Sequence, residues 1–286
     1  MKDTILFGDC RETLSQIDEK VRMCVTSPPY YGLRNYGDEG KQIGLEDTPE
    51  EYINNLVNIF RSVRNCLSDD GTLWVNIGDS YYNYRPGKGQ ALVKQTVSAT
   101  KQDLPDKCAR RGNKLEGLKE KDLIGIPWML AFALRADGWY LRQDIIWNKP
   151  NPMPESVRDR CTKSHEYIFL LSKNQNYYFD VDVIKEPTRR KRSVWNINKK
   201  PYKGSHFAVF PPELITPCIL AGSEKNDIVL DPFMGSGTTA MVARDLGRHY
   251  IGCELHEEYN DLIQQRVPDD KVVHNGLTDL LDGAIL

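Results

Sequence analysis

The chain has 286 residues, 40% of them hydrophobic, and a formal net charge of −2 at pH 7. That length can bury a substantial core, and we expect a single domain over residues 1–286. The small net charge argues against a protein that coats nucleic acid without regard to sequence. Because the sequence has no run of 18 apolar residues and no secretion signal, we expect a cytoplasmic protein with no membrane partner.

The cysteine and histidine spacings exclude two further classes. Seven cysteines without a Cys-x-x-Cys pair, together with five scattered histidines, predict neither a disulfide framework nor a metal site. Five of the cysteines lie in or beside apolar segments and are interpreted as small core residues: Cys10, Cys24, Cys66, Cys218 and Cys253.

In the first half of the chain, apolar runs alternate with helical patterns. Strands are predicted at Thr4–Gly8, Val21–Thr26 and Gly71–Ile77, and helices at Arg11–Asp18 and from Pro49 to about Cys66. Residues 79–121 are polar and without periodicity, which predicts a long mobile loop.

The second half continues the alternation. Helices are predicted at Asp122–Ala136, at Pro211–Ala221 and from about Thr238, and strands at Trp139–Trp147, Tyr167–Leu171, 227–231 and His249–Cys253. This order is typical of an α/β fold with a mostly parallel sheet and helices on both faces.

The turn after Val21–Thr26 carries the first chemical signal, Ser27-Pro28-Pro29-Tyr30. Proline fixes φ and has no N–H, so the carbonyls of Ser27 and Pro28 are predicted to point outward instead of pairing in a ladder. Such acceptors suit a planar molecule with an exocyclic amine, on which Tyr30 can stack at about 1–3 kcal/mol. An ordinary proline turn has the same local sequence, so this motif alone leaves both interpretations open.

The second signal is a glycine-rich turn, Gly235-Ser236-Gly237, between a buried strand and a helix. Glycines let a ligand approach the backbone, and a helix N-terminus offers unpaired N–H groups to an anion. The turn lacks the Gly-Lys-Ser/Thr end of a phosphate-binding loop, which disfavours a nucleoside triphosphate. Glu254 ends the next strand, where ribose hydroxyls are bound in dinucleotide-type folds. A carboxylate at the loop and a ribose at Glu254 fit S-adenosylmethionine.

Ser-Pro-Pro-Tyr at 27–30 and Asp-Pro-Phe-Met-Gly-Ser-Gly-Thr-Thr at 231–239 together resemble the DNA amino-methyltransferases of cytosine N4 and adenine N6. The catalytic motif precedes the cofactor loop, which matches the beta class. The resemblance implies a circularly permuted class I S-adenosylmethionine-dependent methyltransferase fold. Three more blocks resemble the family in the same order: Gly8-Asp9-Cys10, the stretch from Trp147 to Arg160 with His165-Glu166-Tyr167, and His206–Leu214.

The resemblance also implies roles for site residues. A base flipped out of the duplex would place its amine against Ser27 Oγ and the Pro28 carbonyl, beside Pro29, with Tyr30 on the ring. No covalent cysteine intermediate is needed, because the amine is the nucleophile, and the sequence identifies no dedicated general base. The implied cofactor-binding residues are Asp9, Cys10, Phe210, Asp231, Pro232, Phe233, Gly235, Ser236, Gly237, Thr238 and Glu254.

A basic segment lies between the central block and the cofactor half. Residues 185–203 hold eight Lys or Arg against the single acid Glu186. Within a target-recognition segment at 174–204, Arg189, Arg190, Lys191 and Arg192 are predicted to contact the phosphates of double-stranded DNA. A solvated loop without a partner is the alternative for a basic run of this kind.

Several functions remain open at this stage. Ser-Pro-Pro-Tyr goes mostly with cytosine N4 in this family, so the resemblance favours N4-methylcytosine, although a neutral serine suits adenine N6 as well. An RNA or protein amine methyltransferase and a catalytically silent DNA-binding module are the other candidates. The resemblance further implies a prokaryotic or phage restriction-modification setting, and a homodimer, since dimers are frequent in the beta class.

Overall fold

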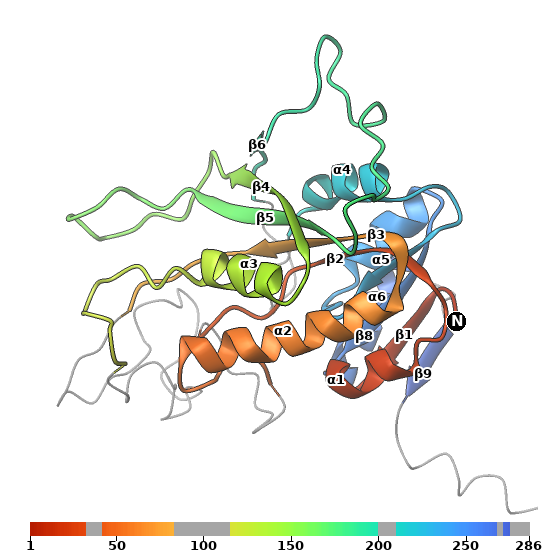
Figure 1. Cartoon of the computed structure of the whole chain (residues 1–286), viewed down its shortest axis with the longest axis horizontal. Coiled ribbons are helices and arrows are strands. Elements are labelled where there is room, and N and C mark those ends of the chain that lie inside the picture. Colours follow the sequence, from red (N-terminus) through yellow and green to blue (C-terminus); the bar gives the residue numbers. More distant parts are fainter. Residues whose placement is uncertain (33–41, 83–114, 200–209, 268–270, 275–286) are drawn as a thin grey trace, which may run out of the picture.

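A nine-stranded sheet forms the centre of the computed structural model, which describes residues 1–32, 42–82, 115–199, 210–267 and 271–274 (Figure 1). The strand order is β6-β4-β5-β3-β2-β7-β8-β1-β9. Neighbours pair in parallel except at β3–β5 and β4–β5, where the pairing is antiparallel. The expected α/β fold with a mostly parallel sheet is confirmed.

The strands and helices have the following bounds. The strands are β1 (Thr4–Phe7), β2 (Val21–Thr26), β3 (Leu67–Ile77), β4 (Tyr140–Asn148), β5 (His165–Ser172), β6 (Val194–Asn196), β7 (Ile228–Asp231), β8 (His249–Glu254) and β9 (Lys271–His274). The helices are α1 (Cys10–Thr13), α2 (Pro49–Cys66), α3 (Ile126–Ala136), α4 (Pro212–Gly222), α5 (Thr238–Asp245) and α6 (Asn260–Arg266), with 3-10 turns at Leu14–Gln16 and Glu257–Tyr259.

Local chemistry explains where the helices begin. α2 starts at Pro49 because Thr48 forms a capping box with Glu51, in which each side chain accepts a hydrogen bond from the other residue's backbone N–H. α3 starts at Ile126, four residues later than predicted, because Pro127 belongs in the first turn, where its missing N–H costs no hydrogen bond. The Asp79 carboxylate accepts hydrogen bonds from the backbone N–H groups of Gly125 and Ile126 at this helix start.

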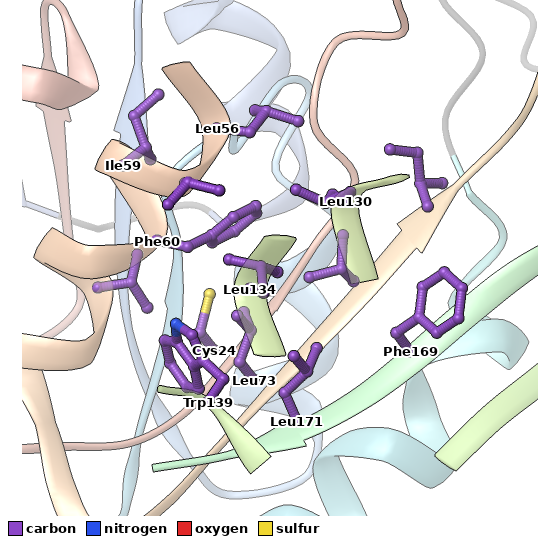
Figure 2. Packing of buried hydrophobic residues seen from close by; sticks show 14 of the residues in the cluster. Cys24, Leu56, Ile59, Phe60, Leu73, Leu130, Leu134, Trp139, Phe169 and Leu171 are labelled. Carbon is purple, nitrogen blue, oxygen red and sulfur yellow. The ribbon is translucent and has the colours of Figure 1, made fainter. Parts of the chain in front are cut away.

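Two hydrophobic cores lie on opposite faces of the sheet. Along β2, the Cys24 side chain faces the core under α2 and α3, whereas Met23 and Val25 face the core under α4 and α5. The first core contains Leu56, Ile59 and Phe60 of α2, Leu130 and Leu134 of α3, and Leu73, Phe169 and Leu171 of the sheet (Figure 2). Full burial of one such side chain contributes about 1.5–3 kcal/mol. The same five cysteines that the sequence placed in the core are buried and free.

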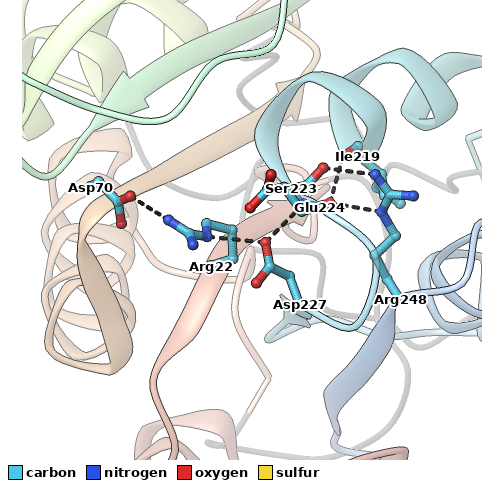
Figure 3. Close-up of polar contacts among 7 residues, drawn as sticks. All are labelled: Arg22, Asp70, Ile219, Ser223, Glu224, Asp227 and Arg248. Atoms are coloured by element: carbon cyan, nitrogen blue, oxygen red, sulfur yellow. Dashed lines mark hydrogen bonds and ion pairs between the residues drawn. The ribbon is translucent and has the colours of Figure 1, made fainter. Parts of the chain in front are cut away.

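A polar network closes the edge of the sheet where β2 and β7 begin (Figure 3). The Arg22 side chain of β2 forms ion pairs with Asp227, at an Nε–Oδ2 distance of 3.0 Å, and with Asp70. Nearby, the buried Arg248 guanidinium donates to the Ser223 backbone carbonyl at 2.7 Å and to the Ser223 hydroxyl at 3.2 Å. These contacts join β2, β3, β7 and the end of α4 at the edge opposite the carboxyl ends of the strands.

Some sequence expectations differ from the structure or lie outside the described residues. β3 begins at Leu67 instead of Gly71, because pairing with β2 continues across an irregularity between Val21 and Met23. Residues 83–114 of the predicted loop and 200–209, which include part of the basic segment, lie outside the described residues. Among the described helices, none has the length and apolar character needed to span a bilayer.

Candidate active site

The residues singled out from the sequence gather at one edge of the sheet. β2, β7, β8 and β1 are consecutive parallel neighbours, so their carboxyl ends meet there. Ser27 follows β2, the glycine-rich turn follows β7, Glu254 ends β8 and Asp9 follows β1. The Gly8 N–H donates to the Glu254 backbone carbonyl at 2.8 Å. In open parallel sheets ligands bind at this edge, so one region can receive both substrates.

The turn at Ser27–Tyr30, the predicted catalytic turn, is held in place by α2. The Tyr52 hydroxyl donates to the Pro29 carbonyl at 2.7 Å, while Ser27, Pro29 and Tyr30 are only partly buried. Gly44 packs against the same turn with φ +96°, and a Cβ there would lie 2.9 Å from the Tyr30 carbonyl oxygen. The close approach requires glycine at this position. The Tyr52 hydrogen bond and the close packing of Gly44 therefore fix the backbone of this turn.

Tyr30 is fixed by a polar cluster that the sequence did not reveal. Its hydroxyl donates to Glu166 Oε2 at 2.8 Å, and the Asn76 amide donates to the same carboxylate oxygen at 3.3 Å. Lys149 Nζ forms an ion pair with Glu166 Oε1 and lies 4.1 Å from the centre of the Trp147 ring. Lys149 follows β4, Glu166 lies at the start of β5 and Asn76 near the end of β3, so the sheet brings all of them beside the catalytic turn.

Burial shapes the electrostatics of this cluster. Burial raises the pKa of the Tyr30 phenol well above its usual range, and the Glu166 charge adds to this effect. Burial lowers the pKa of the Lys149 ammonium, and the adjacent Glu166 carboxylate opposes that shift. Tyr30 therefore stays protonated near neutral pH and serves as a hydrogen-bond donor to Glu166.

Asp231 links β2 to the glycine-rich turn and to α5. Its Oδ1 accepts from the Thr26 hydroxyl at 2.5 Å and from the Phe233 N–H at 3.0 Å, and its Oδ2 accepts from the Thr239 hydroxyl at 2.6 Å. The side chain is buried, and burial raises the pKa of its carboxyl from 3.8 to about 6. This geometry assigns Asp231 the positioning of β2, the loop and α5 relative to one another.

The glycine-rich loop has the features of a ligand cradle. Gly237 has φ +82° and precedes α5, and the loop is joined to β8 by a hydrogen bond of 2.7 Å from the Gly235 N–H to Glu254 Oε2. Burial raises the pKa of the Glu254 carboxyl to about 7. Ser236 Oγ is buried and has no hydrogen-bond partner in the part of the chain that the structure describes. An unsatisfied buried hydroxyl in such a loop fits a site for a polar ligand.

The other predicted cofactor residues lie after β1, after β7, at the start of α5 and before α4. Asp9 caps α1 and accepts from the Arg11 N–H, and Cys10 is buried beneath that turn. Pro232 is buried and Phe233 partly buried, whereas Thr238 Oγ1 accepts from Arg266 at 2.5 Å. Phe210 is partly buried against the core under α4. Their contacts with the cofactor remain predictions.

The basic segment lies at the other end of the sheet, beside β6. Arg189 forms an ion pair with Glu186 at 2.5 Å, and Lys191 Nζ lies 4.9 Å from the centre of the Trp195 ring. Arg190 and Arg192 are exposed. Trp195 of β6 pairs with Trp147 of β4, and Trp147 lies two residues before Lys149. The segment is thus anchored to the strand that ends in the Tyr30 cluster. No metal-binding group of His, Cys, Asp or Glu occurs among the described residues.

This architecture is that of a class I S-adenosylmethionine-dependent methyltransferase. The family model described as DNA methylase, which covers N6 and N4 methyltransferases, matches residues 21–265. The chain is 53% identical over 276 residues to the type II methyltransferase M.SmaI of Serratia marcescens, covering 92% of this chain and 90% of that protein. It is 50% identical over 270 residues to M.Cfr9I of Citrobacter freundii, covering 92% and 87%. The chain belongs to the N6/N4 DNA methylase family.

Solved structures agree on the fold. The PvuII DNA methyltransferase (cytosine-N4-specific) superposes with a TM-score of 0.69 at 19% identity, covering 95% of this chain and 90% of that one. The M1.HpyAVI complex with S-adenosylmethionine superposes with a TM-score of 0.59 at 20% identity, covering 92% and 98%. The assignment of the chain to the DNA amino-methyltransferases is confirmed, and S-adenosylmethionine is the cofactor of this family.

Proposed function

We propose that this DNA amino-methyltransferase methylates N4 of cytosine in duplex DNA. The observation that carries the proposal is the neutral Ser27 hydroxyl in Ser-Pro-Pro-Tyr, at the end of β2 and next to the cofactor loop. The motif goes mostly with cytosine N4 in this family, and the PvuII enzyme is named as cytosine-N4-specific. Adenine N6 is the alternative, since a serine hydroxyl can accept a hydrogen bond from either amine.

Each residue of the Ser27–Tyr30 turn has a separate role in the proposed reaction. S-adenosylmethionine supplies the electrophilic methyl group. Ser27 Oγ and the Pro28 carbonyl would accept hydrogen bonds from the exocyclic amine, which keeps its lone pair off the ring and available as the nucleophile. The Tyr30 ring, fixed through its hydroxyl by Glu166, would stack on the flipped base. Most of the rate enhancement is then expected from positioning of the amine.

The cofactor half would be organised by contacts within the chain. The Ser236 hydroxyl, the loop N–H groups before α5 and the remaining acceptor positions of Glu254 would hold the cofactor. Asp231 would support that site indirectly, because its carboxylate already accepts three hydrogen bonds within the protein. Gly235, Gly237 and Thr238 give the loop its shape.

DNA would be bound beside β6, the outermost strand at one side of the sheet. Arg189, Arg190, Lys191 and Arg192 lie on a segment fixed to β4 through β6. Their charges would neutralise phosphates near the flipped base, which makes the binding salt-dependent. We propose residues 174–204 as the target-recognition segment of a single-domain enzyme.

Nucleoside mass spectrometry tests the proposed reaction. Unmethylated genomic DNA would be incubated with the purified protein and S-adenosylmethionine, digested and analysed, with Ser27→Ala as the matched control. N4-methylcytosine in the wild-type sample alone is the expected result. N6-methyladenine would assign the same site to the other base. The absence of any methylated base would point to an RNA or protein amine, or to a silent DNA-binding module.

A further inference from the structure

Residues 149–164 connect β4 and β5 at the edge of the sheet where β2 ends. β3 runs parallel to β2, and β5 is antiparallel to both β3 and β4, so the end of β4 and the start of β5 lie at the same edge as Ser27. Figure 1 shows this connection extending away from the sheet beyond the ends of both strands. Its base adjoins the Tyr30 cluster, because Lys149 pairs with Glu166, whose carboxylate accepts a hydrogen bond from the Tyr30 hydroxyl.

Met153 is an exposed apolar side chain on this connection. It is 61% exposed, the highest value among the large hydrophobic side chains of the described residues, and it belongs to neither hydrophobic core. Val157, on the same connection, is also exposed. Single exposed apolar side chains are common on protein surfaces, so the surroundings of Met153 decide how its exposure is interpreted.

The backbone around Met153 is stiff and is fixed to the basic segment. Pro152 and Pro154 flank Met153 directly and restrict φ on both sides. The Asn151 side-chain amide donates to the Lys199 carbonyl at 3.1 Å, and the Asn151 side-chain oxygen accepts from the Lys199 N–H at 2.9 Å. A side chain presented by such a backbone can enter a binding partner with little further loss of conformational freedom.

Ion pairs leave the connection with a positive surface. Glu155 is neutralised by Arg160 at 2.6 Å, and Asp159 is neutralised by Lys121 at 2.6 Å. Arg158 is exposed and has no acidic partner in the part of the chain that the structure describes. An exposed apolar side chain within a positive surface suits DNA, which presents phosphates on the outside and stacked bases within.

A base that leaves the duplex creates a gap in the base stack. The neighbouring bases lose stacking contacts, and proteins that deform DNA frequently place an apolar side chain between base steps. Methionine suits an irregular gap, since its side chain is unbranched, flexible and polarisable. Because the flipped base must reach the Ser27–Tyr30 turn, a side chain that fills the gap has to lie at the same edge of the sheet, as Met153 does.

We propose, on the basis of the proposed amino-methyltransferase function, that Met153 enters the base stack of the duplex and takes the place that the target base leaves. The connection lies along the DNA together with the basic segment, to which Asn151 fixes it, and Arg158 contacts phosphates beside Met153. The inserted side chain slows the return of the base and so prolongs the time that the amine spends at Ser27. Met153 contacts the neighbouring bases and not the reacting atoms.

Methylation of matched and mismatched duplexes tests this role. Sequencing of DNA methylated by the wild-type protein first identifies the target base and its surrounding sequence. Met153→Ala should then lower the single-turnover rate on the matched duplex roughly tenfold, because the gap in the stack stays unfilled. A duplex with a mismatched base opposite the target flips it at lower cost, so the same variant should come within about twofold of wild type on that duplex. Met153→Leu, which keeps an apolar side chain, should restore the rate on the matched duplex.

Controls separate the insertion from other causes. Tyr140→Ala removes an exposed side chain at the opposite end of β4 and should leave both rates unchanged. Circular dichroism and the affinity for S-adenosylmethionine would show that Met153→Ala is folded. A wild-type rate of Met153→Ala on the matched duplex, or an equal loss on both duplexes, would overturn the insertion and leave the proposed function intact. Failure of the wild-type protein to methylate DNA would instead refute the proposed function.

Discussion

Asp231→Asn is expected to change the pH dependence of stability in a defined direction. Burial raises the pKa of this carboxyl from 3.8 to about 6, so ionisation costs more in the folded than in the unfolded protein. The difference corresponds to about 3 kcal/mol. The free energy of unfolding of the wild-type protein therefore includes this amount in full below about pH 4, where Asp231 is protonated, and loses it as the pH rises through about 6. A neutral asparagine removes that loss and can still accept from Thr26 Oγ1 and the Phe233 N–H.

Urea unfolding measured between pH 4 and pH 8 provides the assay. The free energy of unfolding of Asp231→Asn, minus that of wild type, should rise by about 3 kcal/mol over this range. Gln265→Asn, an exchange of uncharged side chains at an exposed position of α6, is the control and should show a constant difference. A constant difference for Asp231→Asn would refute the assignment of the raised pKa to burial of this carboxylate.

Three further variants examine other contacts. Gly44→Ala should strain the catalytic turn by about 1–3 kcal/mol and reduce turnover with unchanged cofactor affinity, which isothermal titration would check; an equal loss of both would indicate global damage. Arg22→Gln should cost about 1–3 kcal/mol of unfolding free energy in urea titrations, and wild-type stability would show that the Asp227 and Asp70 contacts contribute nothing. Replacing Arg189, Arg190 and Arg192 by alanine should weaken DNA binding. The slope of the logarithm of the binding constant against the logarithm of the salt concentration should become shallower by about one per lost phosphate contact. Unchanged binding at two salt concentrations would show that the segment does not contact DNA.

Local sequence signals predicted much of the fold. β2 at Val21–Thr26 and α2 at Pro49–Cys66 have the expected bounds, because a short apolar run and a helix with a proline at its start are decided within a few residues. The gathering of Ser27, Asp231 and Glu254 was also predictable, because carboxyl ends of parallel strands share one edge.

Long-range pairing could not be predicted in the same way. Glu166 was part of a block that resembled the family, yet nothing local connects it to Tyr30, 136 positions earlier in the chain. Their contact depends on the antiparallel pairing of β5 with β3 and β4. Asn76 carried no signal, since an asparagine at a strand end is common. The hydrogen bond that the Asp231 carboxylate accepts from the Thr26 hydroxyl likewise joins two strands that are far apart in the sequence.

The position of β1 in the sheet has a consequence for the order in which the protein folds. β1 lies between β8 and β9, and Asp3 bonds to His249 across 246 positions of the chain. Contacts of such separation are slow to form, because a long loop must close before they contribute free energy. α2 can form early in synthesis from local contacts, whereas the turn at Ser27–Tyr30 reaches its final surroundings only when β5 and β7 are in place. A partial chain that lacks β7 and β8 would therefore have neither the Asp231 support of β2 nor the loop that is proposed to hold the methyl donor.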